Sequence, residues 1–279
     1  GASRAAKYGA VAVLIHSLST APDNEPHTGS MSYDEAYPKI PAVALGPDDA
    51  KILYALAKKG TIKAQVQTYG FFLPDADENN VVAEIRGSEF PDQFITLGGH
   101  LDSWDVNEGA HDDGAGIVQT MEVLRVMKAL NYKPKRSIRF VLFANEENGV
   151  RGGNKYANQA KINKENHIFV LESDEGGFTP RSIGITAPPA QFAKFQKWTP
   201  LLKPYGSEIT FGGGGTDIAP MAGINKESIL AGLIPDSQRY FDLHHAKTDV
   251  FENVNKRELH LGAVNMAAII YLIDKYGTN

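Results

Sequence analysis

The chain has 279 residues, of which 42% are hydrophobic and 22% charged, proportions that indicate a globular protein of one or two domains and exclude disordered or collagen-like chains. Its 28 basic and 33 acidic residues give a formal net charge of −5 without any basic block, which disfavours nucleic acid as a partner. Because cysteine is absent, any metal must be bound by His, Asp and Glu, and no apolar run reaches the ~20 residues of a membrane span.

The first seventy residues predict a small α/β unit. Its expected elements, in chain order, are a helix around 4–6, strands at 11–16 and 42–45, a helix at 47–59 and a strand at 61–69. The last strand is expected because apolar and polar side chains alternate there with the period of a half-buried strand. Residues 22–41, rich in Pro, Ser, Asn and Asp, are expected to form a long surface loop.

From about residue 73 the pattern changes to buried strands that alternate with longer helices. The expected strands lie at 81–86, 94–101, 137–144, 167–172 and 227–233, and the expected helices at 114–130, 190–203 and 256–275. This alternation favours an α/β fold with a mostly parallel central sheet flanked by helices. We therefore expect two units, residues 1–72 and residues 73–279.

Three of these strands run directly into acidic or histidine residues. His100 and Asp102 end the first, Glu146 and Glu147 follow the second, and Asp174 follows the third. Ligands bind at the carboxyl edge of open α/β sheets, and one of two adjacent glutamates can bind a metal while the other transfers protons. Asp102 can accept a hydrogen bond from the His100 ring. Taken singly, each motif is equally compatible with a solvated strand end or an exposed acidic loop.

Two further motifs add possible ligands. Asp112 and Asp113 precede the helix expected at residue 114, where an Asp also serves as an ordinary helix N-cap. His111 is expected on the surface. The pair His244 and His245 is, by itself, more often structural than metal-binding. Together, however, two histidines and at least three carboxylates from separate elements suit zinc or manganese better than calcium, and they are enough for two ions that share one carboxylate.

The order and spacing of these motifs resemble the co-catalytic zinc exopeptidases, a family that includes bacterial leucyl aminopeptidases and glutamate carboxypeptidases. The resemblance covers roughly residues 75–279 and is closest to the plasma glutamate carboxypeptidase branch. It rests on the segments 98–105, 112–116, 146–147, 172–174, 212–217 and 244–249. It implies hydrolysis of terminal peptide bonds in small peptides or dipeptides by a zinc-activated water.

The resemblance also implies roles for individual residues. His100 and Asp174 would bind one zinc ion, Glu147 and His245 the other, and Asp112 would bridge the two. His245 is preferred over His244 because the family has an acid four residues after its ligand, and here that residue is Asp249.

Catalytic roles are implied in the same way. Glu146 would be the general base, and Asp102 would orient His100. In relatives the peptide bond after the bridging Asp is often cis, so the Asp112–Asp113 bond is expected to be cis.

Residues that contact the substrate are less sharply indicated. Where several relatives have a tyrosine just before the second histidine ligand, this chain has His244, so the oxyanion could be stabilised by His244, by Tyr240 or by a metal alone. The glycine run 212–215 lacks the pattern of a nucleotide-binding loop. It is expected to line the substrate pocket, which makes Gly214 and Asp217 candidates.

The amino-terminal seventy residues resemble the latter part of the protease-associated domain that this branch inserts into its catalytic fold. We therefore expect a missing amino-terminal segment, with exposed apolar edges that are covered by that segment or by a neighbouring copy in a homodimer. The resemblance also implies an extracellular or periplasmic location.

Two other functions remain open. A glutaminyl cyclase with a single zinc ion shares the fold, and a binding protein without activity could use the same scaffold. The motifs do not distinguish trimming from the amino end from trimming at the carboxyl end.

Overall fold

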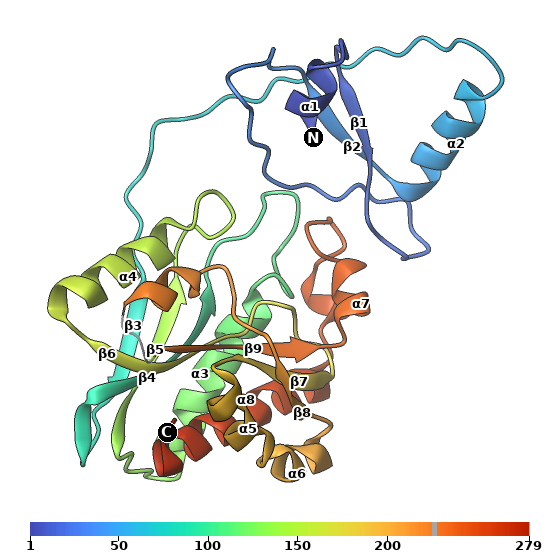
Figure 1. Ribbon diagram of the computed structural model, residues 1–279. Helices are drawn as coiled ribbons and strands as arrows, with labels where there is room; N and C mark the ends of the chain where they lie inside the picture. The colour runs from blue at the N-terminus through green and yellow to red at the C-terminus, as the bar shows by residue number, and fades with distance from the viewer. Residues whose placement is uncertain (225–227, 279) are drawn as a thin grey trace.

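The structure is a computed structural model that describes residues 1–224 and 228–278. Its centre is a seven-stranded sheet (Figure 1). In sheet order the strands are β3 (Val81–Ile85), β5 (Arg136–Phe143), β4 (Phe90–His100), β6 (Asn166–Glu172), β9 (Ile229–Pro235), β7 (Pro180–Thr186) and β8 (Glu208–Phe211). The neighbours β5, β4, β6 and β9 are parallel, whereas β3 and β7 pair antiparallel with β5 and β9. The mostly parallel sheet predicted from the sequence is confirmed.

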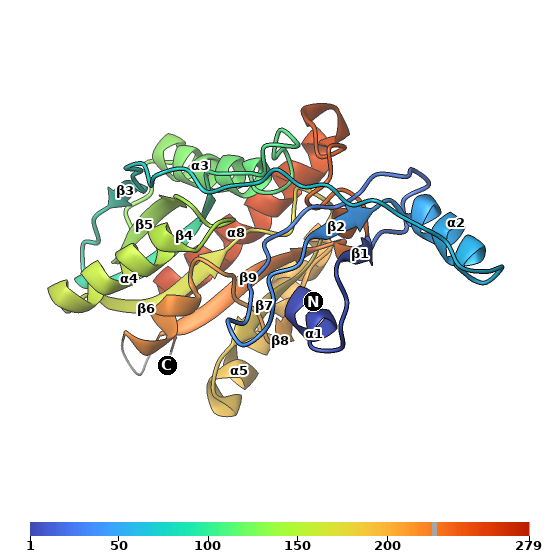
Figure 2. The ribbon, with the colours of Figure 1, turned by 90° about the horizontal axis from the view of Figure 1, so that it is seen from above.

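Helices cover both faces of this sheet (Figure 2). Helices α3 (Gly114–Ala129) and α8 (Lys256–Tyr276) cover one face, and α4 (Arg151–Asn163) with the 3-10 helix η2 (Ala219–Gly223) covers the other. Strand β5 shows the two-sided burial: Ile138 and Phe140 face the α3–α8 layer, whereas Val141 and Phe143 face the α4 layer. Each such buried side chain stabilises the fold by roughly 1.5–3 kcal/mol, so the sheet forms a rigid base for the site.

Short elements complete this unit. They are α5 (Pro189–Gln196), α6 (Thr199–Leu202), the 3-10 helix η1 (Lys203–Tyr205), α7 (Ser237–Phe241) and the 3-10 helix η3 (Phe251–Asn253). Within the described residues, no helix combines the length and apolar character that crossing a bilayer requires.

The amino-terminal unit is much smaller (Figure 1). It consists of α1 (Ala2–Ala6), the parallel strands β1 (Val13–His16) and β2 (Ala42–Leu45), and α2 (Pro47–Ala57). Its buried apolar core is limited to Ala2, Ala6 and Ile40. Between α2 and β3, residues 58–80 have no helix or strand and are mostly exposed.

Several expected elements differ from the structure. Residues 61–69 form no strand, because an alternating pattern yields a strand only where a neighbouring strand pairs with it, and none of the described strands does so there. The helix expected over 190–203 is interrupted between α5 and α6. Pro200, in the first turn of α6, lacks the N–H that a continuous helix would need there. Strands β7 and β8 and helix α4 were not predicted. The expected strand at 227–233 begins at Glu227, which lies outside the described residues, and β9 continues to Pro235.

Candidate metal centre

The residues expected to bind metal meet at the carboxyl edge of the parallel strands. His100 is the last residue of β4, and it pairs in register with Phe143, the last residue of β5. Glu147 therefore follows β5 at the same edge, and Asp174 lies two residues beyond β6. The remaining two, Asp112 and His245, come from the turn before α3 and the loop after α7. One side chain from a strand end and four from four different connections thus converge.

Two sets of ligand atoms share the Asp112 carboxylate. His100 Nε2 lies 3.2 Å from Asp112 Oδ1 and 3.2 Å from Asp174 Oδ1. His245 Nε2 lies 3.3 Å from Asp112 Oδ2 and 3.2 Å from Glu147 Oε2. Each oxygen of Asp112 therefore faces a different histidine and a different second carboxylate, which is the arrangement that a bridging carboxylate between two cations requires.

The hydrogen bonds of the two histidines fix which ring nitrogen faces the carboxylates. His100 Nδ1 lies 2.8 Å from the Asp102 carbonyl oxygen, and His245 Nδ1 lies 3.1 Å from the Thr28 carbonyl oxygen. Because a carbonyl oxygen can only accept, both Nδ1 atoms carry the proton and donate it. Nε2 of each ring is thus directed at the shared carboxylate, as in metal-binding histidines.

Asp102 plays a different part from the one expected. Its carboxylate is 3.7 Å from His100 Nδ1, and the closer partner is its backbone carbonyl. The carboxylate instead accepts hydrogen bonds from the backbone N–H groups of Glu146, at 2.9 Å, and Glu147, at 3.2 Å. Asp102 therefore orients His100 through its backbone and the two glutamates through its side chain.

The electrostatics of the cluster favour positive charge at its centre. Burial lowers the pKa of His100 and of His245, but the surrounding carboxylates outweigh it: Asp112 and Asp174 raise the pKa of His100 well above its usual range, and Asp112 and Glu147 raise that of His245 to about 10. The buried Glu147 Oε1 has no hydrogen-bond partner among the described residues. Nitrogen and carboxylate donors with an unpaired buried oxygen fit zinc in place of these protons.

The turn that carries Asp112 is held from two sides. The Asp249 carboxylate accepts hydrogen bonds from the backbone N–H groups of His111, at 2.7 Å, and Asp112, at 3.0 Å. Asp113 accepts from the His100 N–H and, as N-cap of α3, from Gly116. The Asp112–Asp113 peptide bond is cis, as expected.

The prediction that His111 lies on the surface is wrong. The side chain is buried and stacks on Phe178 with ring centroids 4.1 Å apart. Its Nδ1 accepts a hydrogen bond from the backbone N–H of Gly177 at 3.0 Å. A single histidine in a polar turn gives no sequence signal of this burial, because the ring that covers it comes from a distant segment.

A cavity of about 710 Å³ opens onto the metal cluster. Its lining includes Glu146, Trp104, Thr216, Tyr240 and His244. Burial is the main cause that raises the pKa of Glu146 above its ordinary value, and the negative charge of Asp174 adds to it. The Thr216 side chain makes a hydrogen bond with the Glu146 carboxylate. Glu146 therefore faces the cavity beside the ligand sets. Neither Trp104 nor Thr216 was given a role from the sequence, although both lie within segments that carry the family resemblance.

The substrate candidates divide into two groups. Tyr240 and His244 line the cavity, and burial together with His245 lowers the pKa of His244 to about 4, so its ring is neutral. Gly214 and Asp217 are not among the lining residues. The glycines 212–215 are also absent from this lining, and their role in binding substrate stays a prediction. A Cβ on Gly215 would overlap the Glu172 carboxylate, so this glycine permits close packing.

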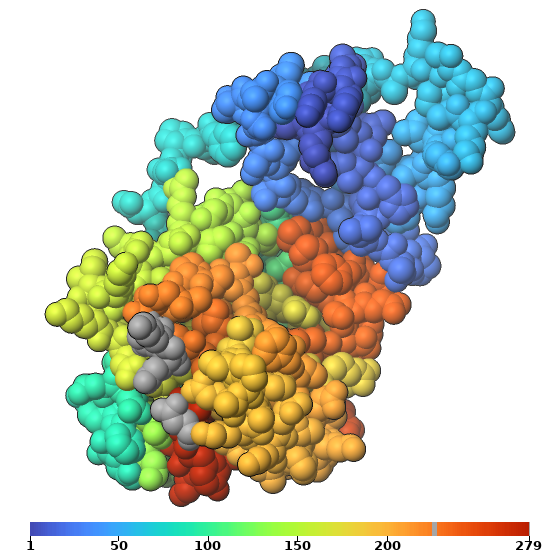
Figure 3. Space-filling model, in the orientation of Figure 1, coloured from blue at the N-terminus to red at the C-terminus, as the bar shows by residue number. Residues whose placement is uncertain are grey.

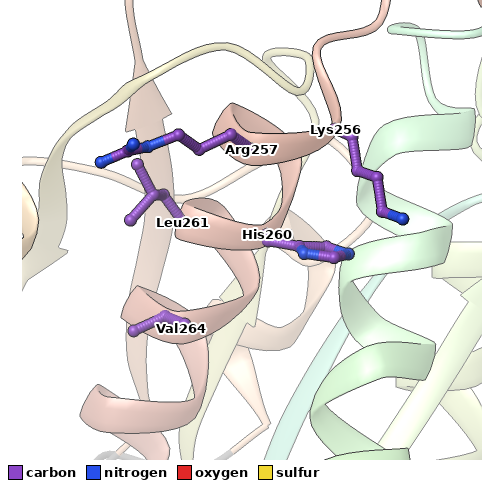
Figure 4. A pocket seen from close by; sticks show the side chains of 5 residues that line it. All are labelled: Lys256, Arg257, His260, Leu261 and Val264. Atoms are coloured by element: carbon purple, nitrogen blue, oxygen red, sulfur yellow. The ribbon is translucent and has the colours of Figure 1, made fainter.

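A second hollow, of about 420 Å³, lies over α8. Figure 4 shows its side chains along one face of the helix; they are Lys256, Arg257, His260, Leu261 and Val264. Without a carboxylate, these residues offer no counterpart to the metal cluster.

The chain is similar to known proteins over almost its whole length. Carboxypeptidase Q from Bos taurus is 36% identical over 275 residues, which are 98% of this chain and 58% of the relative. The crystal structure of a peptidase M28 precursor from Shewanella amazonensis SB2B is 30% identical with a TM-score of 0.85, and the match covers 98% of this chain and 62% of that one. BSAP, a zinc aminopeptidase from Bacillus subtilis, has a TM-score of 0.62 at 18% identity over 97% of this chain and 66% of that one, and supports the fold alone.

The chain spans 58% of the length of the Bos taurus relative. The profile of peptidase family M28 matches residues 80–270, the part that contains the seven-stranded sheet and all five convergent side chains. Because this match includes well over half of the sequence, the chain belongs to peptidase family M28.

Proposed function

We propose that the chain carries the active site of a zinc-dependent exopeptidase that hydrolyses terminal peptide bonds of small peptides or dipeptides with two zinc ions. The observation that supports this most directly is the Asp112 carboxylate, whose two oxygens lie 3.2 Å and 3.3 Å from the Nε2 atoms of His100 and His245. An exposed acidic loop would not direct two histidines at opposite oxygens of one buried carboxylate.

In this proposal His100 and Asp174 would hold one zinc ion, His245 and Glu147 would hold the other, and Asp112 would be shared between them. Zinc, when bound, polarises the scissile carbonyl and makes a water molecule acidic enough to attack near neutral pH. The protonated histidines of the metal-free site must release their protons when metal binds.

Glu146 acts as the general base. Its side chain lines the cavity without belonging to either ligand set, and its raised pKa brings it closer to the pH range in which it can both accept and return a proton. It takes a proton from the attacking water and passes it to the leaving amine. Burial, reinforced by the Asp112 carboxylate, raises the pKa of Tyr240, so its phenol stays protonated and can donate to the oxyanion. His244, neutral at the same cavity, is the second candidate donor.

Zinc content and turnover of dipeptides test this proposal together. We expect the purified protein to bind two equivalents of zinc, to hydrolyse dipeptides, and to lose activity with a chelator and regain it when zinc is added. Binding of one zinc equivalent, together with cyclisation of the amino-terminal glutamine of a peptide, would instead support the glutaminyl cyclase alternative. Two equivalents without turnover of any dipeptide would support a silent binding protein.

Other expectations stay predictions. They are the partial protease-associated domain in residues 1–72, the homodimer, and the extracellular or periplasmic location. The end of the substrate that is trimmed is also open; dipeptides blocked at either terminus distinguish the two cases.

A further inference from the structure

The loop that carries His245 needs support from outside itself. His245 has a backbone φ of +59°, in the left-handed region, which costs of order 1–3 kcal/mol for a residue other than glycine. It lies after α7 in a segment without strand structure. Contacts from another part of the chain are therefore required to hold its ring in place.

These contacts come from residues 17–30 of the amino-terminal unit, which we call the strap. The backbone N–H of Thr28 donates to the His245 carbonyl at 2.9 Å, and His245 Nδ1–H donates to the Thr28 carbonyl at 3.1 Å. One strap residue thus fixes both the backbone and the ring of His245. The second bond also sets the tautomer that directs Nε2 at Asp112.

The strap holds the same loop on both sides of His245. Before it, Asp242 Oδ1 accepts hydrogen bonds from the backbone N–H of Thr20, at 2.8 Å, and from its hydroxyl, at 2.9 Å. After it, Lys247 Nζ lies 2.7 Å from Glu25. Figure 3 shows the blue amino-terminal unit lying against the orange-red region that contains this loop.

The strap is itself tied to the regular elements of the amino-terminal unit. The Ser17 N–H donates to the carbonyl of Leu45 at the end of β2, at 3.1 Å. The Asn24 side chain accepts hydrogen bonds from the N–H groups of Asp48, at 3.0 Å, and Asp49, at 3.1 Å, in the first turn of α2. The position of the strap therefore depends on the folding of this unit.

We propose that the strap is a positioning element for His245, through which the amino-terminal unit sets the affinity of one of the two metal sites. This rests on the proposed two-zinc function. Loss of a hydrogen-bond partner that orients a metal-bound histidine typically weakens metal binding by about 10- to 100-fold. His100 takes its orientation from Asp102. The hydrogen bonds and ion pairs that it makes among the described residues are all with residues outside the strap, so the effect is expected at the His245 site.

The test compares Thr28→Pro with Thr28→Ala in the full chain. The proline variant lacks the N–H that donates to His245, whereas the alanine variant keeps both backbone groups of residue 28 and loses only the side chain. The affinity for each of the two zinc equivalents is measured by competition with a chromogenic chelator. We expect one affinity to be about 10-fold weaker in T28P than in T28A and the other to be equal in both. The effect is at the lower end of the range because the Thr28 carbonyl still accepts from the His245 ring, while the loop that carries the ring loses its backbone bond to the strap.

Asp242→Ala provides a second variant, at an exposed contact that folding of the core does not require. It removes the acceptor for Thr20, and Asp242→Asn, which keeps an acceptor oxygen, should restore most of the affinity. If wild type binds two zinc ions and T28P and D242A, folded by circular dichroism, bind both with wild-type affinity, the strap has no positioning role. If wild type itself binds fewer than two, the proposed function fails first and the inference fails with it.

Discussion

His100 and His245, the two histidines of the metal centre, are placed by different parts of the molecule. His100 ends the central strand β4 and is 1% exposed, with buried strands on both sides. His245 is 17% exposed and lies on a loop that contacts the strap. The first position follows from the packing of the sheet, whereas the second depends on a contact across 217 residues of sequence.

The main core thus positions His100, whereas the amino-terminal unit helps to position His245. In β4 and β6 the side chains of Ile95, Leu97, Phe169 and Leu171 are fully buried, so displacing His100 would disturb the main core. The amino-terminal unit buries little apolar surface of its own. A change there can therefore alter the His245 site while the sheet remains intact.

The largest effect should come from Glu146, which serves neither histidine as a partner. Glu146→Gln is expected to lower kcat by about 10²- to 10⁴-fold, since a general base contributes roughly that much, while both zinc equivalents are retained. Steady-state kinetics and metal analysis check this. Glu208→Gln, on an exposed position of the distant strand β8, is the matched control. Activity near the wild-type level in E146Q would remove Glu146 from the mechanism.

Alanine substitutions of the two histidines test the comparison itself. Each is expected to lose one zinc equivalent. In the metal-free protein, His100→Ala should lower the free energy of unfolding by about 3–5 kcal/mol, because it leaves the Asp112 and Asp174 carboxylates without their buried partner. His245→Ala should lower the free energy of unfolding by less than half as much, because that ring is partly exposed. Equal losses in urea denaturation would mean that the two sites are equally embedded in the core.

Three of the predicted ligands, His100, Glu147 and Asp174, had a stronger sequence signal than His245, for a physical reason. His100, Glu147 and Asp174 each lie within four residues of the end of a buried strand, and buried strands have a strong apolar pattern. No such pattern precedes His245, whose assignment depended on resemblance. Thr28 acts through its backbone, which no residue type reveals.

The fold shows the same limit. The central strands β4, β5 and β6 were predicted because both of their faces are buried, which produces continuous apolar runs. Strand β8 has only four residues, with exposed ends, and gave no comparable signal. The alternation over residues 61–69 predicted a strand that is absent, because alternation describes a side chain pattern and cannot supply the neighbouring strand that pairing requires.

The ionisation of Asp217 reports how strongly the protein interior around this residue is shielded from water. The side chain is fully buried, and neither oxygen has a hydrogen-bond partner among the described residues. Burial raises its pKa from 3.8 to about 8, although His100 opposes the shift. Between these two pH values the unfolded chain ionises and the folded chain stays protonated, so the folded state loses stability as pH rises from about 4 to about 8.

Asp217→Asn removes this ionisation. Relative to wild type, the metal-free variant should gain stability as pH rises, reaching on the order of a few kcal/mol at pH 8 and little at pH 4. Urea denaturation at both pH values measures the difference. A variant that is no more stable than wild type at pH 8 would show that Asp217 is ionised in the folded protein and has a partner in solution.

Asp102 contacts residues of both proposed zinc sites. Its variants should give the smallest change among those proposed here. Its carbonyl orients His100, and its carboxylate holds the N–H groups of Glu146 and Glu147. Asp102→Ala keeps the carbonyl and loses the carboxylate, so zinc binding at the Glu147 site and kcat should fall by about 10- to 100-fold, while the His100 site keeps its affinity. Asp102→Asn retains one acceptor oxygen and should fall between Ala and wild type. Equal weakening of both zinc ions in D102A would mean that the Asp102 side chain, rather than its backbone, orients His100, contrary to the hydrogen bonding described above.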